Sequence, residues 1–177
     1  MSSSTLNSLR TLSNVLRKVS HDEYSAKITS NMADTMSGKK KLVKTRDDFF
    51  KYLNDNIVDI EIDAPKGSKK GFGGKKRVLP FHYGEVTGAI NIADNMGWDV
   101  IFPPSQEDPS AIKKAVPIGI VEVNPDEATW MKNGNKMPPI GNDKIIVSKD
   151  GKISEEDKSI ISNFFNGMWQ FKEIVWL

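Results

Sequence analysis

Short apolar segments broken by glycine and proline dominate the chain from residue 57 onward, and this pattern restricts the fold more than any other feature. The apolar stretches at 98–102, 116–123 and 145–148 are each too short for a core helix. Residues 58–63 alternate apolar and acidic side chains, which is typical of a half-buried strand. Many short strands followed by one late helix predict a small barrel rather than alternating strand–helix–strand units.

Two capping motifs mark helix starts, one before this region and one within it. Thr45 is followed by Asp48, and Ser154 by Asp157, so that each pair can satisfy the first free backbone N–H groups of a helix. We therefore expect a short helix after residue 45, and a second one from 154 to about 165 whose apolar side chains face the barrel.

The remaining strands complete the predicted domain. We expect a strand at 78–83, which Pro80 would confine to an edge or a bulge, and a closing strand at 173–177. The predicted fold class is α+β and mainly β: a five-stranded OB-like barrel with one or two packed helices and an N-terminal helical arm. The barrel domain is assigned to residues 46–177.

Residues 1–45 form the predicted arm, an amphipathic helix at 4–19 followed by a basic linker. Apolar side chains recur there every three to four residues, which places them on one helix face. A helix this short is marginal alone in water, so the stripe needs a surface to cover, on its own barrel or on another chain. The stripe consists of Leu6, Leu9, Leu12, Leu16 and Val19.

Composition excludes several kinds of protein. The chain has no cysteine, which rules out disulfides, thiolate metal sites and a cysteine nucleophile. No apolar run approaches the roughly 20 residues that span a bilayer, and the N-terminus lacks the apolar core of a secretory signal. We therefore expect no membrane partner and a cytoplasmic or virion location.

The net charge of +2 hides two basic clusters, at 39–46 and 66–77. Such loops can meet phosphate, nucleic acid or an acidic partner, or they can simply be solvated. Aromatic side chains do not alternate with these lysines as they do on nucleic-acid-binding barrels, so nucleic acid is not an expected partner.

Seven segments, taken in order, resemble the family I (soluble) inorganic pyrophosphatases. The resemblance covers about residues 57–177. Its segments are 61–70, 80–84, 94–100, 116–120, 141–145, 163–165 and 175–176.

This resemblance implies a specific chemistry. In the family, a carboxylate cluster binds Mg²⁺ ions that activate a water and clamp the transferring phosphoryl group, while lysines and tyrosines hold phosphate. Carried over by motif, the metal ligands would be Glu61, Asp94 and Asp99. The phosphate ligands would be Lys70, Tyr83 and Lys144, with Lys69 as the alternative to Lys70.

The sequence departs from the family at the catalytic centre. The position of the aspartate that holds the nucleophilic water falls at Met96, whose thioether is a poor ligand for Mg²⁺. A second acidic position falls at Asn142, and a tyrosine–lysine pair falls at Met168 and Trp169. No catalytic residue is therefore assigned.

Two functions follow as expectations. In the first, the fold is retained without catalysis, and the protein is a homo-oligomer or a subunit of a larger assembly, such as a phage virion, that docks through its arm. In the second, it is a divergent diphosphatase that uses Mg²⁺ to hydrolyse pyrophosphate to two phosphates. The folded structure should distinguish the two functions. Diphosphatase activity requires Asp94, Asp99, Glu61 and a further carboxylate such as Asp126 to lie within metal-ligand distance of one point. Packing of Met96 and Trp98 at that point would instead favour the non-catalytic function.

Overall fold

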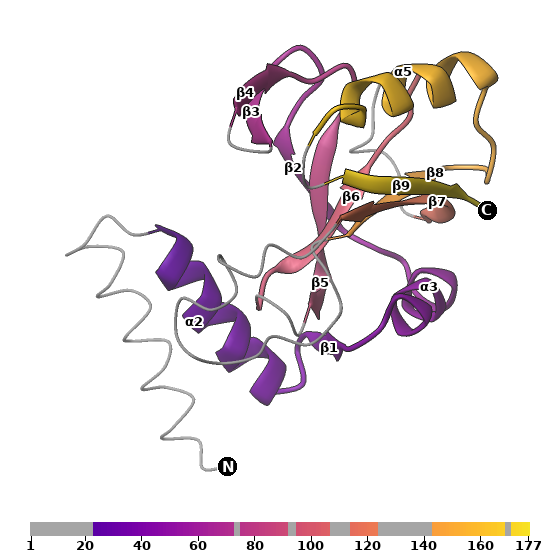
Figure 1. The fold of residues 1–177 in the computed structure, drawn as a ribbon. Helices are drawn as coiled ribbons and strands as arrows, with labels where there is room; N and C mark the ends of the chain where they lie inside the picture. The colour runs from indigo at the N-terminus through magenta and orange to yellow at the C-terminus, as the bar shows by residue number, and fades with distance from the viewer. Residues whose placement is uncertain (1–22, 73–74, 92–94, 107–113, 124–142, 169–170) are drawn as a thin grey trace.

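A computed structural model describes residues 23–72, 75–91, 95–106, 114–123, 143–168 and 171–177 (Figure 1). The helices among them are α2 (Glu23–Met36), α3 (Arg46–Asp55) and α5 (Glu155–Phe165). The strands are β1 (Lys41–Val43), β2 (Ile60–Ala64), β3 (Lys69–Phe72), β4 (Lys75–Val78), β5 (Tyr83–Asn91), β6 (Gly97–Ile101), β7 (Val116–Val123), β8 (Lys144–Ser148) and β9 (Phe171–Trp176).

The described strands form one seven-stranded mixed sheet and a separate hairpin. The sheet order is β1-β5-β6-β8-β7-β9, and β2 also pairs with β5. β1 with β5 and β6 with β8 are parallel, whereas the other pairs are antiparallel. β3 and β4 form the hairpin. The fold class is thus α+β and mainly sheet.

The two faces of the sheet carry separate hydrophobic clusters because side chains alternate along each strand. On one face, Phe49 of α3 stacks on Trp98 of β6, with ring centroids 4.6 Å apart. On the other face, Ile161 and Phe165 of α5 pack against Ile101 and its neighbours. Figure 1 shows α5 and α3 on opposite sides of the sheet.

The hydroxyl half of each predicted capping motif is present. Thr45 and Ser154 are the N-caps of α3 and α5, and each hydroxyl accepts a hydrogen bond from the backbone N–H three residues later, at 3.0 Å. These contacts satisfy donors that the first helical turn leaves free. Both helices therefore begin where the sequence predicted.

Several predicted boundaries differ from the structure. Residues 23–43, predicted to lie in a linker, contain α2 and β1 instead. The predicted strand at 78–83 is wrong between Leu79 and His82, because these residues form the connection between β4 and β5. Pro80, which has no N–H to donate, therefore lies outside the strands. The predicted arm helix at 4–19 lies outside the described residues.

The sheet does not close into a barrel within the described part of the chain. β9 lies at one end of the strand order, and β1 and β2 lie at the other, on β5. No pairing between the described residues joins these two ends. The described architecture is therefore an open seven-stranded sheet, where the sequence predicted five strands in a barrel.

Candidate functional site

A row of carboxylates crosses three neighbouring strands on the face that carries α5. Glu61 of β2 is the register partner of Glu85 of β5, which is in turn the partner of Asp99 of β6. Directly opposed residues place their Cβ atoms about 5 Å apart. Asp63 interacts electrostatically with both Glu61 and Asp99. We call Glu61, Asp63, Glu85 and Asp99 the acidic site.

Three lysines from different elements face these carboxylates. Lys27 Nζ of α2 lies 2.5 Å from Glu85 Oε1 and 3.7 Å from Glu61 Oε2. Lys70 Nζ of β3 lies 3.9 Å from Asp63 Oδ2. Lys144 of β8 donates to Asp99 Oδ2. Every carboxylate of the acidic site is therefore within ion-pair distance of a lysine.

Gly97 makes room for the most deeply buried carboxylate. A Cβ atom at this position would lie 2.9 Å from Glu85 Cδ and 2.9 Å from the carbonyl oxygen of Val86. Glu85 is only 4% exposed, so its side chain has little alternative space. The absence of a side chain at residue 97 allows Glu85 to lie across β6.

Tyr83 joins the acidic site to the hydrophobic cluster beneath α5. Its ring is 3% exposed, and Phe72 packs against it edge-on with centroids 5.4 Å apart. The ammonium groups of Lys70 and Lys144 lie 4.5 Å and 6.0 Å from the ring centroid, within the range of cation–π attraction. The ring thus helps to hold both lysines over the sheet.

Burial and ion pairing shift the pKa values of these groups in opposite directions. Burial raises the pKa of Glu85, and the Lys27 ammonium offsets only part of this effect. Burial also raises the pKa of Asp63, against the attraction of Lys70 and Lys27. Burial lowers the pKa of Lys27, but the contact with Glu85 outweighs it and the net pKa is raised, since Lys27 is the more exposed partner.

The structure brings together five of the residues predicted from sequence: Glu61, Lys70, Tyr83, Asp99 and Lys144. It also separates the two alternatives for the loop lysine. Lys69 is exposed and pairs in register with Val78, on the opposite face of the hairpin from Lys70.

Other predicted positions lie elsewhere or outside the described residues. Asp94, Asp126 and Asn142 are outside them, as is the apolar stripe of the arm. Met96 lies in the turn between β5 and β6, where its carbonyl accepts from the Asn91 N–H at 2.8 Å. Trp98 does not fill the acidic site, because it points to the face covered by α3.

Sequence reasoning missed Lys27 and Glu85. Glu85 lies two residues after Tyr83 and therefore on the same face of β5, a signal that would have been usable once that strand was recognised. Lys27 lies in α2, outside the pyrophosphatase-like segments, and no motif marks it.

The described residues contain no group of three or more histidine, aspartate or glutamate side chains arranged to hold a metal ion. Carboxylate oxygens are the ligand type that Mg²⁺ prefers, so Glu61 and Asp99 are chemically suitable ligands. Their lysine partners, however, already lie where positive charge would bind.

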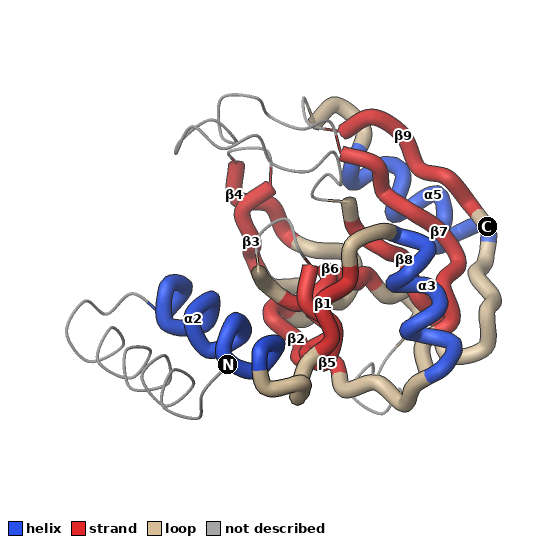
Figure 2. Tube along the Cα trace, turned by 90° about the horizontal axis from the view of Figure 1, so that it is seen from below, coloured by secondary structure: helices blue, strands red, loops and turns tan. Residues whose placement is uncertain are grey.

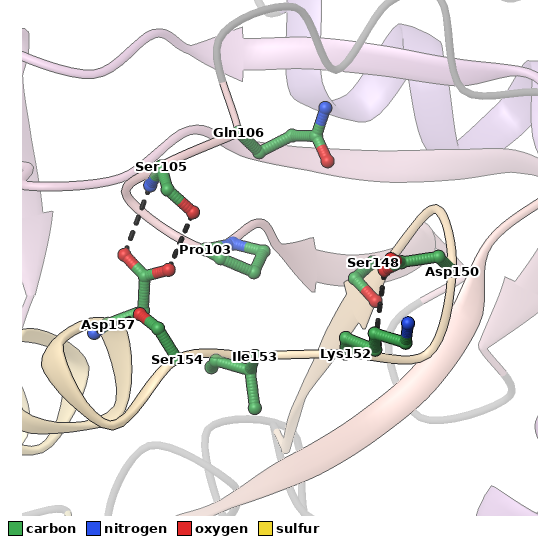
Figure 3. A pocket seen from close by; sticks show the side chains of 9 residues that line it. All are labelled: Pro103, Ser105, Gln106, Ser148, Asp150, Lys152, Ile153, Ser154 and Asp157. Carbon is green, nitrogen blue, oxygen red and sulfur yellow. Dashed lines mark hydrogen bonds between the residues drawn. The ribbon is translucent and has the colours of Figure 1, made fainter.

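A separate hollow of about 360 Å³ lies at the start of α5 (Figure 3). Asp157 there accepts hydrogen bonds from the backbone N–H and the hydroxyl of Ser105, at 3.1 and 2.6 Å. The Ser148 hydroxyl at the other end is buried and has no hydrogen-bond partner among the described residues. None of its lining residues belongs to the acidic site.

Comparison of the chain with protein-family models, curated proteins and solved structures gave no match. None of the helices in the described part of the chain combines the length and apolar character needed to cross a bilayer.

Proposed function

We propose that this chain is a pyrophosphatase-like protein that has kept the family's sheet without its catalysis, and that it serves as a structural or assembly subunit of a larger particle such as a phage virion. The observation that carries the loss of catalysis is the pairing of every acidic-site carboxylate with a lysine.

The reason for the loss of catalysis is electrostatic. Mg²⁺-assisted phosphoryl transfer needs carboxylates that are available to the metal and a position for the activated water. Here three lysine ammonium groups lie against the four carboxylates, with Lys27 shared by Glu61 and Glu85, and Met96 stands at the position that corresponds by motif to the water-holding aspartate. A metal would have to displace lysines from partly buried ion pairs, at a cost in lost charge-assisted hydrogen bonds.

We also propose that the open sheet is an opened form of the OB-like barrel of the pyrophosphatase family. Register shifts interrupt four of the strand pairs, including β5 with β2 and with β6. Such irregularities bend and twist strands, as the corners of small barrels require.

The assembly role is tested by the mass of the full-length protein in solution, measured by light scattering. Replacing Leu9 and Leu12 with serine removes two of the five side chains of the predicted docking stripe and should reduce the mass of the particle. Ile57→Ser is the matched control, because Ile57 is apolar and 81% exposed but lies outside the stripe. A mass that the stripe variant leaves unchanged argues against docking through the arm.

The alternative is a divergent Mg²⁺-dependent diphosphatase that releases two phosphates from pyrophosphate. It is favoured by the convergence of Glu61, Lys70, Tyr83, Asp99 and Lys144, because these residue types in the family bind metal and phosphate. If this function holds, lysine pairs must open when Mg²⁺ and substrate bind.

Phosphate release from pyrophosphate with millimolar Mg²⁺ separates the two functions. We expect no turnover in the wild type. Met96→Asp should gain activity if the missing aspartate is the main deficit, and Met32→Asp is the control because Met32 is exposed at 43% in α2. Chelator-sensitive turnover in the wild type would replace the first proposal with the second.

A further inference from the structure

Glu85 is a buried carboxylate whose counter-charge comes from outside the sheet. Its side chain is 5% exposed, and Lys27 of α2 lies 2.5 Å away. The other two lysines of the acidic site are engaged elsewhere, Lys70 with Asp63 and Lys144 with Asp99. A buried charge without a partner is strongly unfavourable, so Glu85 depends on α2 for its counter-charge.

α2 lies beside the end of the sheet that carries β1, β2 and β5 (Figure 1 and Figure 2). Lys27 also reaches Glu61, 3.7 Å away, so one ammonium group bridges two strands. One turn further along the helix, Asn31 donates to the carbonyl oxygen of Asn95 at 2.8 Å, in the turn between β5 and β6. The same helix face therefore touches both the acidic site and the turn beside it.

The link between α2 and β1 is a compact turn. Gly38 has φ 75°, and the N–H groups of Gly38 and Lys39 donate to Thr35 and Asp34 at the end of the helix. This is the glycine termination expected after a helix, and it fixes the direction in which the chain leaves α2. Three residues later β1 pairs with β5, so α2 is anchored at one end.

We propose that α2 is a latch: its Lys27 ammonium supplies in cis the cation of the Glu61–Glu85 pair, and release of α2 exposes these two carboxylates to a cation from solution. The contact is autoinhibitory for any cation-dependent activity of the acidic site. It concerns the same site as the proposed function, but it does not require that the site be catalytic.

The experiment uses the full chain and compares wild type with Lys27→Met, which keeps most of the length of the side chain and removes its charge. Lys39→Met is the matched control, since Lys39 is exposed and lies just beyond α2. Two quantities are measured without pyrophosphate: hydrogen exchange of the α2 amides, and Mn²⁺ binding by electron paramagnetic resonance. Activity plays no part in either readout, so failure of the latch and failure of the proposed function are distinguishable.

We expect Lys27→Met to speed exchange in α2 on the order of tenfold, the factor equivalent to one hydrogen bond to a charged group. It should also gain a Mn²⁺ site that the further substitution Glu85→Gln abolishes, while Lys39→Met behaves as wild type. Unchanged exchange in Lys27→Met, or Mn²⁺ binding equal to that of the wild type, would overturn the latch.

Folding of the variants is informative in itself. If Lys27→Met fails to fold and the double variant with Glu85→Gln folds, the dependence of Glu85 on the α2 cation is supported. If both fail, Lys27 acts through packing rather than charge, and the proposal is overturned.

Discussion

Replacing Gly97 with alanine tests the placement of Glu85 most directly. The added Cβ would lie 2.9 Å from Glu85 Cδ, 3.0 Å from Glu85 Cβ and 2.9 Å from the Val86 carbonyl oxygen. These distances are about 0.5 Å shorter than an ordinary carbon contact of about 3.5 Å. The carbonyl oxygen belongs to the backbone of a paired strand, so moving the Glu85 side chain cannot relieve the whole overlap.

Overpacking of this kind costs about 1–3 kcal/mol in the free energy of unfolding. For a chain of this size, 1 kcal/mol corresponds to roughly 2–4 °C in Tm. Urea denaturation followed by tryptophan fluorescence measures the cost. In a Glu85→Ala background the penalty of Gly97→Ala should shrink without vanishing, because only the contact with Cδ is removed.

Gly71→Ala is the control for this prediction. Nothing lies within 4 Å of a Cβ atom at Gly71, so the substitution should be neutral or slightly stabilising, through the reduced freedom of the unfolded chain. A Gly97→Ala penalty below about 0.5 kcal/mol, the size of an ordinary surface substitution, would refute the close approach of Glu85 to β6.

Three further predictions concern packing, capping and pH. Phe49→Ala should cost about 3–5 kcal/mol in urea denaturation, because the ring is fully buried against Trp98, and a cost below about 1 kcal/mol would contradict the stack. Ser154→Ala should cost about 1 kcal/mol, and Ser154→Asn should restore most of the loss, since both serine and asparagine cap helices well. Glu85→Gln and Glu122→Gln should change the pH dependence of stability in opposite directions. Burial raises the folded-state pKa of Glu85 above the ordinary 4.5. The free energy of unfolding of the wild type should therefore rise relative to that of Glu85→Gln as the pH falls from neutral through that pKa toward 4.5. Hydrogen bonds from lysine and arginine lower the pKa of Glu122. The wild type should therefore lose its stability advantage over Glu122→Gln as the pH falls from 4.5 through the folded-state pKa. If the stability of the two variants relative to wild type changed with pH in the same direction, the opposite pKa shifts of Glu85 and Glu122 would be contradicted.

Prediction from sequence succeeded where local chemistry decides the structure. β7 spans residues 116–123 as predicted, and β8 begins one residue before the predicted 145. Both contain buried β-branched side chains, which favour strands: Ile120 and Val121 in β7, and Ile145, Ile146 and Val147 in β8. The caps at Thr45 and Ser154 depend on neighbours three residues away, so they too are readable from the chain.

Prediction failed where distant partners decide. β5 extends to Asn91 through Gly84, Thr87 and Gly88, which break the apolar pattern expected of a strand. Three strands pair with it, and these ladders outweigh its weak intrinsic preference. α2 was missed for a related reason, because the apolar side chains that it buries among the described residues, Ala26 and Ala33, are small and lie among polar neighbours.

The candidate site shows the same division. Glu61, Lys70, Tyr83, Asp99 and Lys144 were taken from a resemblance to a family pattern, since local spacing alone does not show which distant residues meet. Lys27 lies outside that pattern, and its role depends on the register that places Glu85 between Glu61 and Asp99. No spacing along the chain contains that information.

The position of β8 has a consequence for how the protein is made. All five of its residues are buried, and it fills the place between β6 and β7. A ribosome synthesises β6 and β7 first, so each has an edge of unpaired backbone N–H and C=O groups until β8 follows. During that interval the nascent chain is a substrate for chaperones. Ribosome-bound chains in which a C-terminal linker brings β6 and β7, but not β8, out of the tunnel should recruit them, whereas chains in which a linker after residue 177 brings out the whole sheet should not.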